Sequence, residues 1–210
     1  MLIAARGVAS LAEEIITKEL KDNPEYKLLL VGHSLGGSVA SILGTLWEKK
    51  YSDVTVYAFG AACVSPIDDR GGARIFSVVS DGDPFSCLSL GHVADVSFAL
   101  AYLCENPDLR ATILMRTDEP VDKMEERDLQ WCSETMTEMQ GDMVGEKLYP
   151  PGQLLFLSSP NKKDDTCRLI EVPPEFFRDL RIYPRMFSLS RHVPRLYETR
   201  LRKCVAAATL

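Results

Sequence analysis

Residues 26–37 read YKLLLVGHSLGG, an apolar run that leads into Gly32-His33-Ser34-Leu35-Gly36. The segment Tyr26 to Val31 is short and almost wholly apolar, as expected of a parallel strand that is buried on both faces. From about Ser34 to Lys49, apolar residues recur at helical spacing, which predicts an amphipathic helix. A G-x-S-x-G sequence between a buried strand and a helix is typical of a nucleophile elbow.

The elbow predicts a chemistry for its central serine. A sharp strand-to-helix turn lifts the Ser34 hydroxyl clear of the sheet, and Gly32, Gly36 and Gly37 are expected to let strand and helix approach closely. The start of the helix supplies free N–H groups and a positive dipole, so the backbone N–H of Leu35 is the expected oxyanion donor. We therefore expect Ser34 to attack an ester-type carbonyl.

A serine nucleophile needs a base, and the chain has three histidines. His33 lies inside the elbow, where neighbouring side chains point apart, so we do not expect it to serve Ser34. His92 is expected to be a surface or helix-start histidine. His192 follows the last predicted strand and fits the chain order of serine, acid and histidine found in α/β-hydrolases, so it is the predicted base.

The acid that orients the histidine should follow a strand after the elbow strand. Ser80-Asp81-Gly82-Asp83-Pro84 comes directly after the strand-like run Arg74 to Val79. Asp83 is the predicted acid, Asp81 is the reserve and Asp95 is a third candidate. The alternative is that Asp81 and Asp83 only form a turn, for which S-D-G-D is well suited.

The rest of the chain predicts an α/β fold with a mostly parallel sheet flanked by helices. Helices are expected at 2–22 and 192–206, and strands at 54–59, 74–79, 153–157 and 167–172. In the first helix, Ala4, Val8, Leu11 and Ile15 fall on one stripe, which predicts its buried face. The stretch 105–148 is rich in acids and is predicted to be a mobile insertion with some helix.

Composition excludes several function classes. The net charge of −6 argues against a nucleic-acid partner, which would need a basic face. The six cysteines form no C-x-x-C pair, so we expect free thiols and no metal. The start of the chain lacks the pattern of a secretory signal, and no apolar run reaches the length that spans a bilayer, so a cytoplasmic location, peripheral at membranes, is expected.

With these motifs the sequence resembles the class 3 lipases, in particular their diacylglycerol-lipase-like branch. The resemblance runs from about residue 2 to residue 203. It is carried by residues 31–37, Phe59-Gly60, Asp83-Pro84, Leu90-Gly91-His92, Pro150-Pro151-Gly152, and His192 with Pro194 and Tyr197. The family implies an α/β-hydrolase domain in which Ser34 is the nucleophile, Asp83 the acid and His192 the base. It also implies acylglycerols as substrates, with no cofactor and no metal.

The sequence departs from the family pattern at two places. Arg191 stands where many members have an acid just before the histidine. Members also have a strand and an oxyanion loop upstream of the first helix, and this sequence begins at that helix. The resemblance therefore implies one partial domain, 1–210, whose N-terminal strands and second oxyanion donor are missing.

Other functions remain open at this point. The chain could be a catalytically weak or silent lipase-like fragment with a binding or regulatory role, or another serine esterase or acyltransferase. The last helix is basic and amphipathic, which is compatible with binding calmodulin or anionic lipid but is more often simply a solvated outer face.

Overall fold

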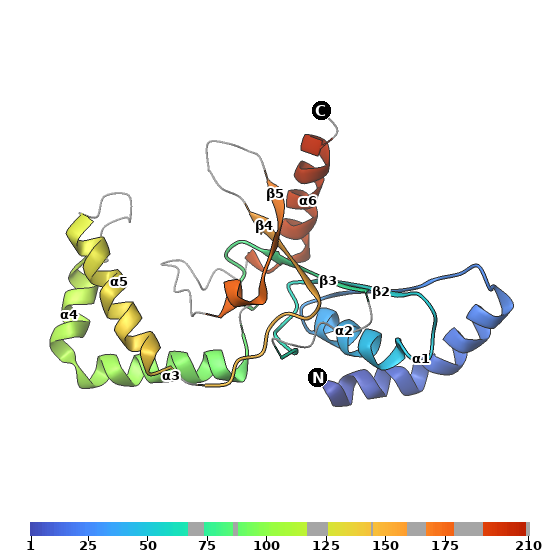
Figure 1. The fold of residues 1–210 in the computed structure, drawn as a ribbon, viewed down its shortest axis with the longest axis horizontal. Coiled ribbons are helices and arrows are strands. Elements are labelled where there is room, and N and C mark those ends of the chain that lie inside the picture. Colours follow the sequence, from blue (N-terminus) through green and yellow to red (C-terminus); the bar gives the residue numbers. More distant parts are fainter. Residues whose placement is uncertain are drawn as a thin grey trace. The chain divides into compact units, whose positions relative to one another are not determined.

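The computed structural model describes residues 1–66, 74–85, 88–116, 126–143, 145–158, 167–178 and 191–208. The chain divides into two compact units. The first unit combines Met1–Ser89 with Leu148–Leu210, and the second is Leu90–Lys147. Figure 1 shows the helices and strands of both units.

The first unit contains a five-stranded sheet in the order β1-β2-β3-β4-β5. Its strands are β1 (Leu28–His33), β2 (Val54–Phe59), β3 (Arg74–Ser80), β4 (Gln153–Ser158) and β5 (Arg168–Val172). The first four strands are parallel, and β5 is antiparallel to β4. The carboxyl ends of β1, β2 and β3 therefore meet at one edge of the sheet, which brings together the segments that follow them.

Helices α1 (Leu2–Asp22), α2 (Leu35–Trp47) and α6 (Pro194–Ala208) belong to the same unit. Helix α2 packs against β1 and β2, and α1 packs against α2 (Figure 1). The predicted α/β class, with a mostly parallel sheet flanked by helices, is confirmed, and the strand-turn-helix at β1 and α2 is that of an α/β-hydrolase.

The buried face of α1 is not the predicted one. Leu11 and Ile15 are 79% and 65% exposed. The face that packs on α2 is instead made of Ala5, Ala9, Ala12, Ile16 and Leu20. Both stripes have helical spacing, and the second is rich in alanine, whose small side chain allows two helices to lie close together. Spacing alone could not choose between them.

Strand β1 is also buried differently from the prediction. It begins at Leu28, and its residues alternate between partly buried and exposed. Leu28 and Leu30 pack against the core, while Leu29 and Val31 are 56% and 61% exposed. Among the described strands, β1 is the first in the order of the sheet, and the face of β1 that carries Leu29 and Val31 is exposed.

The second unit consists of helices in its described part. These are α3 (Leu90–Glu105), α4 (Pro107–Arg116) and α5 (Glu126–Gly141). Ala99, Met139 and Met143 form its buried core, against which Phe98 and Tyr102 pack. The prediction of some helix in 105–148 agrees with α4 and α5, and the predicted mobility of that segment stays a prediction. Residues 117–125 and 144 lie outside the described part.

Candidate active site

Ser34 occupies the turn between β1 and α2. Its backbone has φ 56° and ψ −126°, in the region that non-glycine residues rarely adopt. The Ser34 N–H donates to the carbonyl oxygen of Phe59, at the end of β2, over 2.9 Å. The turn is therefore held by the neighbouring strand in a conformation that a free chain would avoid, as the elbow motif predicts.

Two of the three elbow glycines are required by the close approach of strand and helix. A Cβ added to Gly32 would lie 2.3 Å from the carbonyl oxygen of Gly36 and 2.6 Å from the backbone nitrogen of Gly37. A Cβ on Gly37 would meet the Gly32 oxygen at 3.1 Å. The prediction that Gly36 is needed for this approach is wrong, because a Cβ there would meet nothing within 4 Å. Gly36 matters here through its backbone, which occupies the space beside Gly32.

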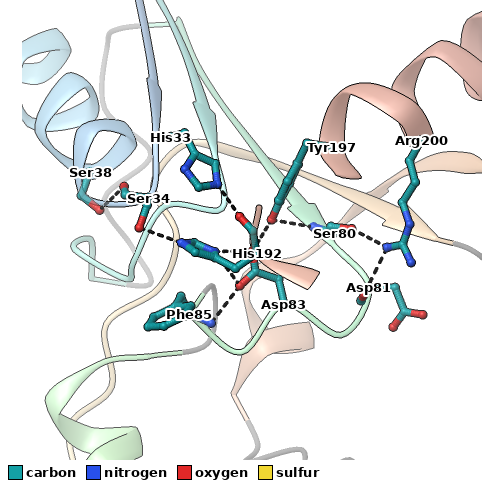
Figure 2. Close-up of polar contacts among 10 residues, drawn as sticks. All are labelled: His33, Ser34, Ser38, Ser80, Asp81, Asp83, Phe85, His192, Tyr197 and Arg200. Carbon is teal, nitrogen blue, oxygen red and sulfur yellow. Dashed lines mark hydrogen bonds and ion pairs between the residues drawn. The ribbon is translucent and has the colours of Figure 1, made fainter. Parts of the chain in front are cut away.

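The structure brings Ser34, His192 and Asp83 together from three separate segments of the first unit (Figure 2). Ser34 Oγ lies 2.7 Å from His192 Nε2, and His192 Nδ1 lies 2.8 Å and 3.0 Å from the two carboxylate oxygens of Asp83. A carboxylate only accepts hydrogen bonds, so Nδ1 carries the proton and Nε2 of the neutral ring is free to accept from the Ser34 hydroxyl. This is the tautomer that a general base needs.

Asp83 is buried, with 5% of its surface exposed, and its carboxylate has further donors. The Tyr197 hydroxyl donates to Asp83 Oδ2 over 2.5 Å, and the Phe85 N–H donates to Oδ1 over 2.9 Å. The same hydroxyl accepts from the Ser80 N–H over 3.1 Å. These bonds orient the carboxylate toward His192.

The residue directly after β2, Gly60, has to be a glycine. It has φ +56°, and a Cβ there would lie 2.8 Å from Asp83 Oδ2 and 2.9 Å from the Tyr197 hydroxyl. Reasoning from the residues did not assign a role to Gly60 or Tyr197, which entered only through the family resemblance. The available signals were a glycine directly after a strand and a tyrosine in the first turn of the helix that follows His192.

His33 takes part in the site in a way that the sequence did not predict. Its side chain bonds to the backbone of His192 rather than to Ser34. His33 Nε2 lies 2.6 Å from the carbonyl oxygen of His192. The imidazole of His192 contacts two other rings. Its centroid lies 4.6 Å from that of His33 and 4.3 Å from that of Phe85.

The other candidates lie elsewhere. The backbone carbonyl of Asp81 accepts from Arg191 over 3.4 Å and from Arg200 over 3.1 Å. Asp95 belongs to the second unit, where its Oδ2 lies 3.0 Å from Lys147 Nζ. His92 lies at the start of α3, as predicted, but it is buried rather than on the surface, with 1% of it exposed.

The Leu35 N–H is placed where an oxyanion donor is expected. Leu35 is the first residue of α2, so its N–H lies in the turn whose amides have no acceptor within the helix. The helix dipole adds positive potential at the same point. Its side chain is 57% exposed beside Ser34.

Within the described ranges, no group of three or more His, Cys, Asp or Glu side chains is placed to hold a metal ion. Over the same residues, no helix has both the length and the apolarity to cross a lipid bilayer.

Comparison with known proteins agrees with the motif at the elbow. Residues 1–90 match the family described as Lipase (class 3). The secreted mono- and diacylglycerol lipase A of Penicillium cyclopium is 37% identical over 95 aligned residues, and the alignment covers 40% of this chain and 31% of that protein. Diacylglycerol lipase-beta of Mus musculus is 36% identical over 66 aligned residues, and the alignment covers 27% of this chain and 10% of that protein.

The match thus spans about a third or less of the length of these curated relatives. Among solved structures, an MDLA mutant from Penicillium cyclopium aligns with 91% of this chain and 56% of its own, at 18% identity and a TM-score of 0.48. The lipase of Rhizopus microsporus var. chinensis aligns with 42% of this chain and 34% of its own, at 24% identity and a TM-score of 0.39. The similarity of this chain to the class 3 lipase family is thus carried by residues 1–90.

Proposed function

We propose that this chain is a serine-type acylglycerol lipase that hydrolyses carboxylic esters through an acyl-enzyme. The observation that carries the proposal is the continuous hydrogen-bonded chain from Ser34 Oγ through His192 to Asp83, with Ser34 on a strained turn at the start of a helix. Supporting it, the mono- and diacylglycerol lipase of Penicillium cyclopium and the diacylglycerol lipase-beta of Mus musculus are similar in sequence to this chain.

In the proposed reaction, Ser34 Oγ attacks the ester carbonyl carbon while His192 Nε2 takes the hydroxyl proton. The developing oxyanion accepts a hydrogen bond from the Leu35 N–H. Asp83 stabilises the imidazolium that forms on His192. The carbon–oxygen bond to the leaving alcohol then breaks, the alcohol takes the proton from Nε2, and the acyl group stays on Ser34. Water, activated by the same histidine, releases the fatty acid.

A fluorophosphonate probe tests the nucleophile independently of the substrate. Such a probe reacts with a serine that is activated by a base, so we expect covalent labelling of the chain at Ser34 and none in Ser34→Ala. Ser38 is a matched control, because it lies on the next turn of α2 and its hydroxyl bonds to the carbonyl of Ala62. Labelling that persists in Ser34→Ala, or that disappears in Ser38→Ala alone, would contradict the assignment.

The substrate class is tested by comparing hydrolysis of dispersed diacylglycerol with hydrolysis of a soluble short-chain ester. We expect diacylglycerol to be the better substrate by kcat/KM. A preference for the soluble ester would favour the alternative of a different serine esterase. Labelling without hydrolysis of either would favour an acyltransferase or a catalytically weak chain with another role.

A peripheral position at a lipid surface belongs to the same proposal. Three apolar side chains close in sequence to the site residues are exposed, namely Leu35 at 57%, Leu88 at 43% and Val193 at 44%. Sedimentation with phosphatidylcholine vesicles should carry the chain down, and Leu88→Ser with Val193→Ser should leave more of it in solution. Equal sedimentation of both proteins would contradict this contact.

The basic helix α6 is a weaker candidate for calmodulin or anionic lipid. Arg200 donates to Ser80 Oγ and to the carbonyl of Asp81, and Arg202 pairs with Glu198 over 2.7 Å. Two of its cations are therefore engaged within the chain. Adding phosphatidylserine to the vesicles should change sedimentation little if the apolar contact dominates.

A further inference from the structure

The bond between His33 and the backbone of His192 joins the two segments that must meet for catalysis. His33 directly precedes Ser34, and the carbonyl that it contacts belongs to the residue that bonds to Ser34 Oγ. These segments are 159 positions apart in the chain, so their relative position depends on tertiary contacts. A side-chain bond at 2.6 Å at this point acts directly on the distance between nucleophile and base.

The acceptor determines the form of His33. A backbone carbonyl can only accept, so His33 Nε2 must carry the proton and donate it. The bond thus differs from that of His192, whose Nε2 must be unprotonated to accept from Ser34. Nε2 therefore carries a proton in His33 and none in His192, and only His192 Nε2 can accept the proton of Ser34.

The rings add a second constraint on the same imidazole. The His33 ring lies 4.6 Å from the His192 ring with an interplanar angle of 41°, and the Phe85 ring lies 4.3 Å from it with an angle of 43°. The rings of Tyr197 and His33 lie edge to face, with their centroids 5.8 Å apart. His33 is therefore packed as well as bonded, and it limits both the backbone and the ring of His192.

We propose that His33 is a positioning residue for the base: its Nε2–H holds the His192 carbonyl and thereby keeps His192 Nε2 within hydrogen-bond reach of Ser34 Oγ. The role rests on the proposed function only in that His192 acts as the base. The hydrogen bond of His33 goes to the His192 carbonyl, whereas the Ser34 hydroxyl bonds to His192 Nε2. This positioning role explains why a histidine, with a donor at the end of a short rigid ring, suits the position before the nucleophile.

Two substitutions separate the donor from the ring. His33→Phe keeps a planar ring and removes the donor, while His33→Gln removes the ring and keeps an N–H donor at a similar reach. Misplacement of reacting groups by about 1 Å can lower a rate by about 100-fold, so the Phe variant should lose about 10- to 100-fold in the rate of fluorophosphonate labelling and in kcat. KM should stay unchanged, and the Gln variant should keep most of the wild-type rate.

Proton NMR of the full chain gives a readout that does not need turnover. The Nδ1–H of His192, bonded to Asp83, should give a resolved downfield resonance in the wild type and in His33→Gln. The resonance should broaden or vanish in His33→Phe, because the ring of His192 then samples other orientations. Urea unfolding of each variant, measured in parallel, reports the folded fraction.

The proposal is overturned if His33→Phe labels as fast as the wild type, or if the Gln variant is as slow as the Phe variant. It is also overturned if labelling falls only in proportion to the folded fraction, since a merely structural role would do that. Failure of the proposed function looks different. A wild-type chain that is neither labelled nor active on diacylglycerol would remove that function, while the Nδ1–H resonance would still report whether His33 positions His192.

Discussion

Replacing Gly32 by alanine should damage the site more than any other single-methyl change in the elbow. The added Cβ would lie 2.3 Å from the Gly36 oxygen, 2.4 Å from the Gly36 carbonyl carbon and 2.6 Å from the Gly37 nitrogen. Ordinary contact begins at 3.4 Å, so the first turn of α2 would have to retreat by about 1 Å. All three atoms are backbone, and no side chain can turn aside to make room.

The expected magnitudes follow from that displacement. Overpacking of a close-packed contact typically costs 1–3 kcal/mol, and we expect about 3 kcal/mol for Gly32→Ala because the backbone of a helix must move. The same shift would carry Ser34, which lies between the strand and the helix, away from His192. A shift of about 1 Å between reacting groups can cost about 100-fold in rate, so labelling of Ser34 should slow by that order.

Gly36→Ala is the matched control, since it changes the other glycine of the same motif. A Cβ at Gly36 meets nothing within 4 Å, and alanine favours a helix over glycine by up to about 1 kcal/mol. We expect this variant to be as stable as the wild type or slightly more stable, with the labelling rate kept. The assays are urea unfolding followed by circular dichroism and the rate of fluorophosphonate labelling. If Gly32→Ala is as stable as Gly36→Ala, the close contact of β1 and α2 described here is refuted.

Three further predictions concern the acid, its support and the exposed face of the sheet. Asp83→Asn should lower the labelling rate by about 10⁴-fold, as expected when the base holds the wrong tautomer. Asp81→Asn, in the same loop, should change the labelling rate little. Equal effects of the two substitutions would mean that the acid is misassigned. Tyr197→Phe should lower the free energy of unfolding by about 3 kcal/mol, because a buried carboxylate and a buried N–H each lose a partner, and it should slow labelling less than Asp83→Asn does. An unchanged urea midpoint would show that the Tyr197 hydroxyl is not engaged as described. Leu29→Lys places a charge on the exposed apolar face of β1. It should therefore reduce self-association in analytical ultracentrifugation without loss of stability. Greater association than in the wild type would contradict the exposure of that face.

Local patterns in the sequence were sufficient for the strands of the sheet, for the first helix and for the elbow. A short apolar run, a G-x-S-x-G turn and an amphipathic run predict strand, turn and helix around Ser34 because each follows from neighbours within a few residues. The same local reasoning located β2 at Val54–Phe59 and α1 at Leu2–Asp22, as the structure has them. Chain order and the ends of strands then singled out Asp83 and His192.

The choice of faces and partners depended on tertiary structure, because it is made by residues that are distant in the chain. Two stripes of α1 have helical spacing, and only its packing on α2 selects the one with Ala5 and Ala9. An apolar strand reads as buried, but Leu29 and Val31 on β1 and Tyr57 on β2 lie on a face of the sheet that is exposed. The bond from His33 to the backbone of His192 crosses 159 positions, so no local pattern predicts it. Local periodicity determines which elements form, whereas the surfaces that they bury and the contacts of their side chains are decided only when the elements meet.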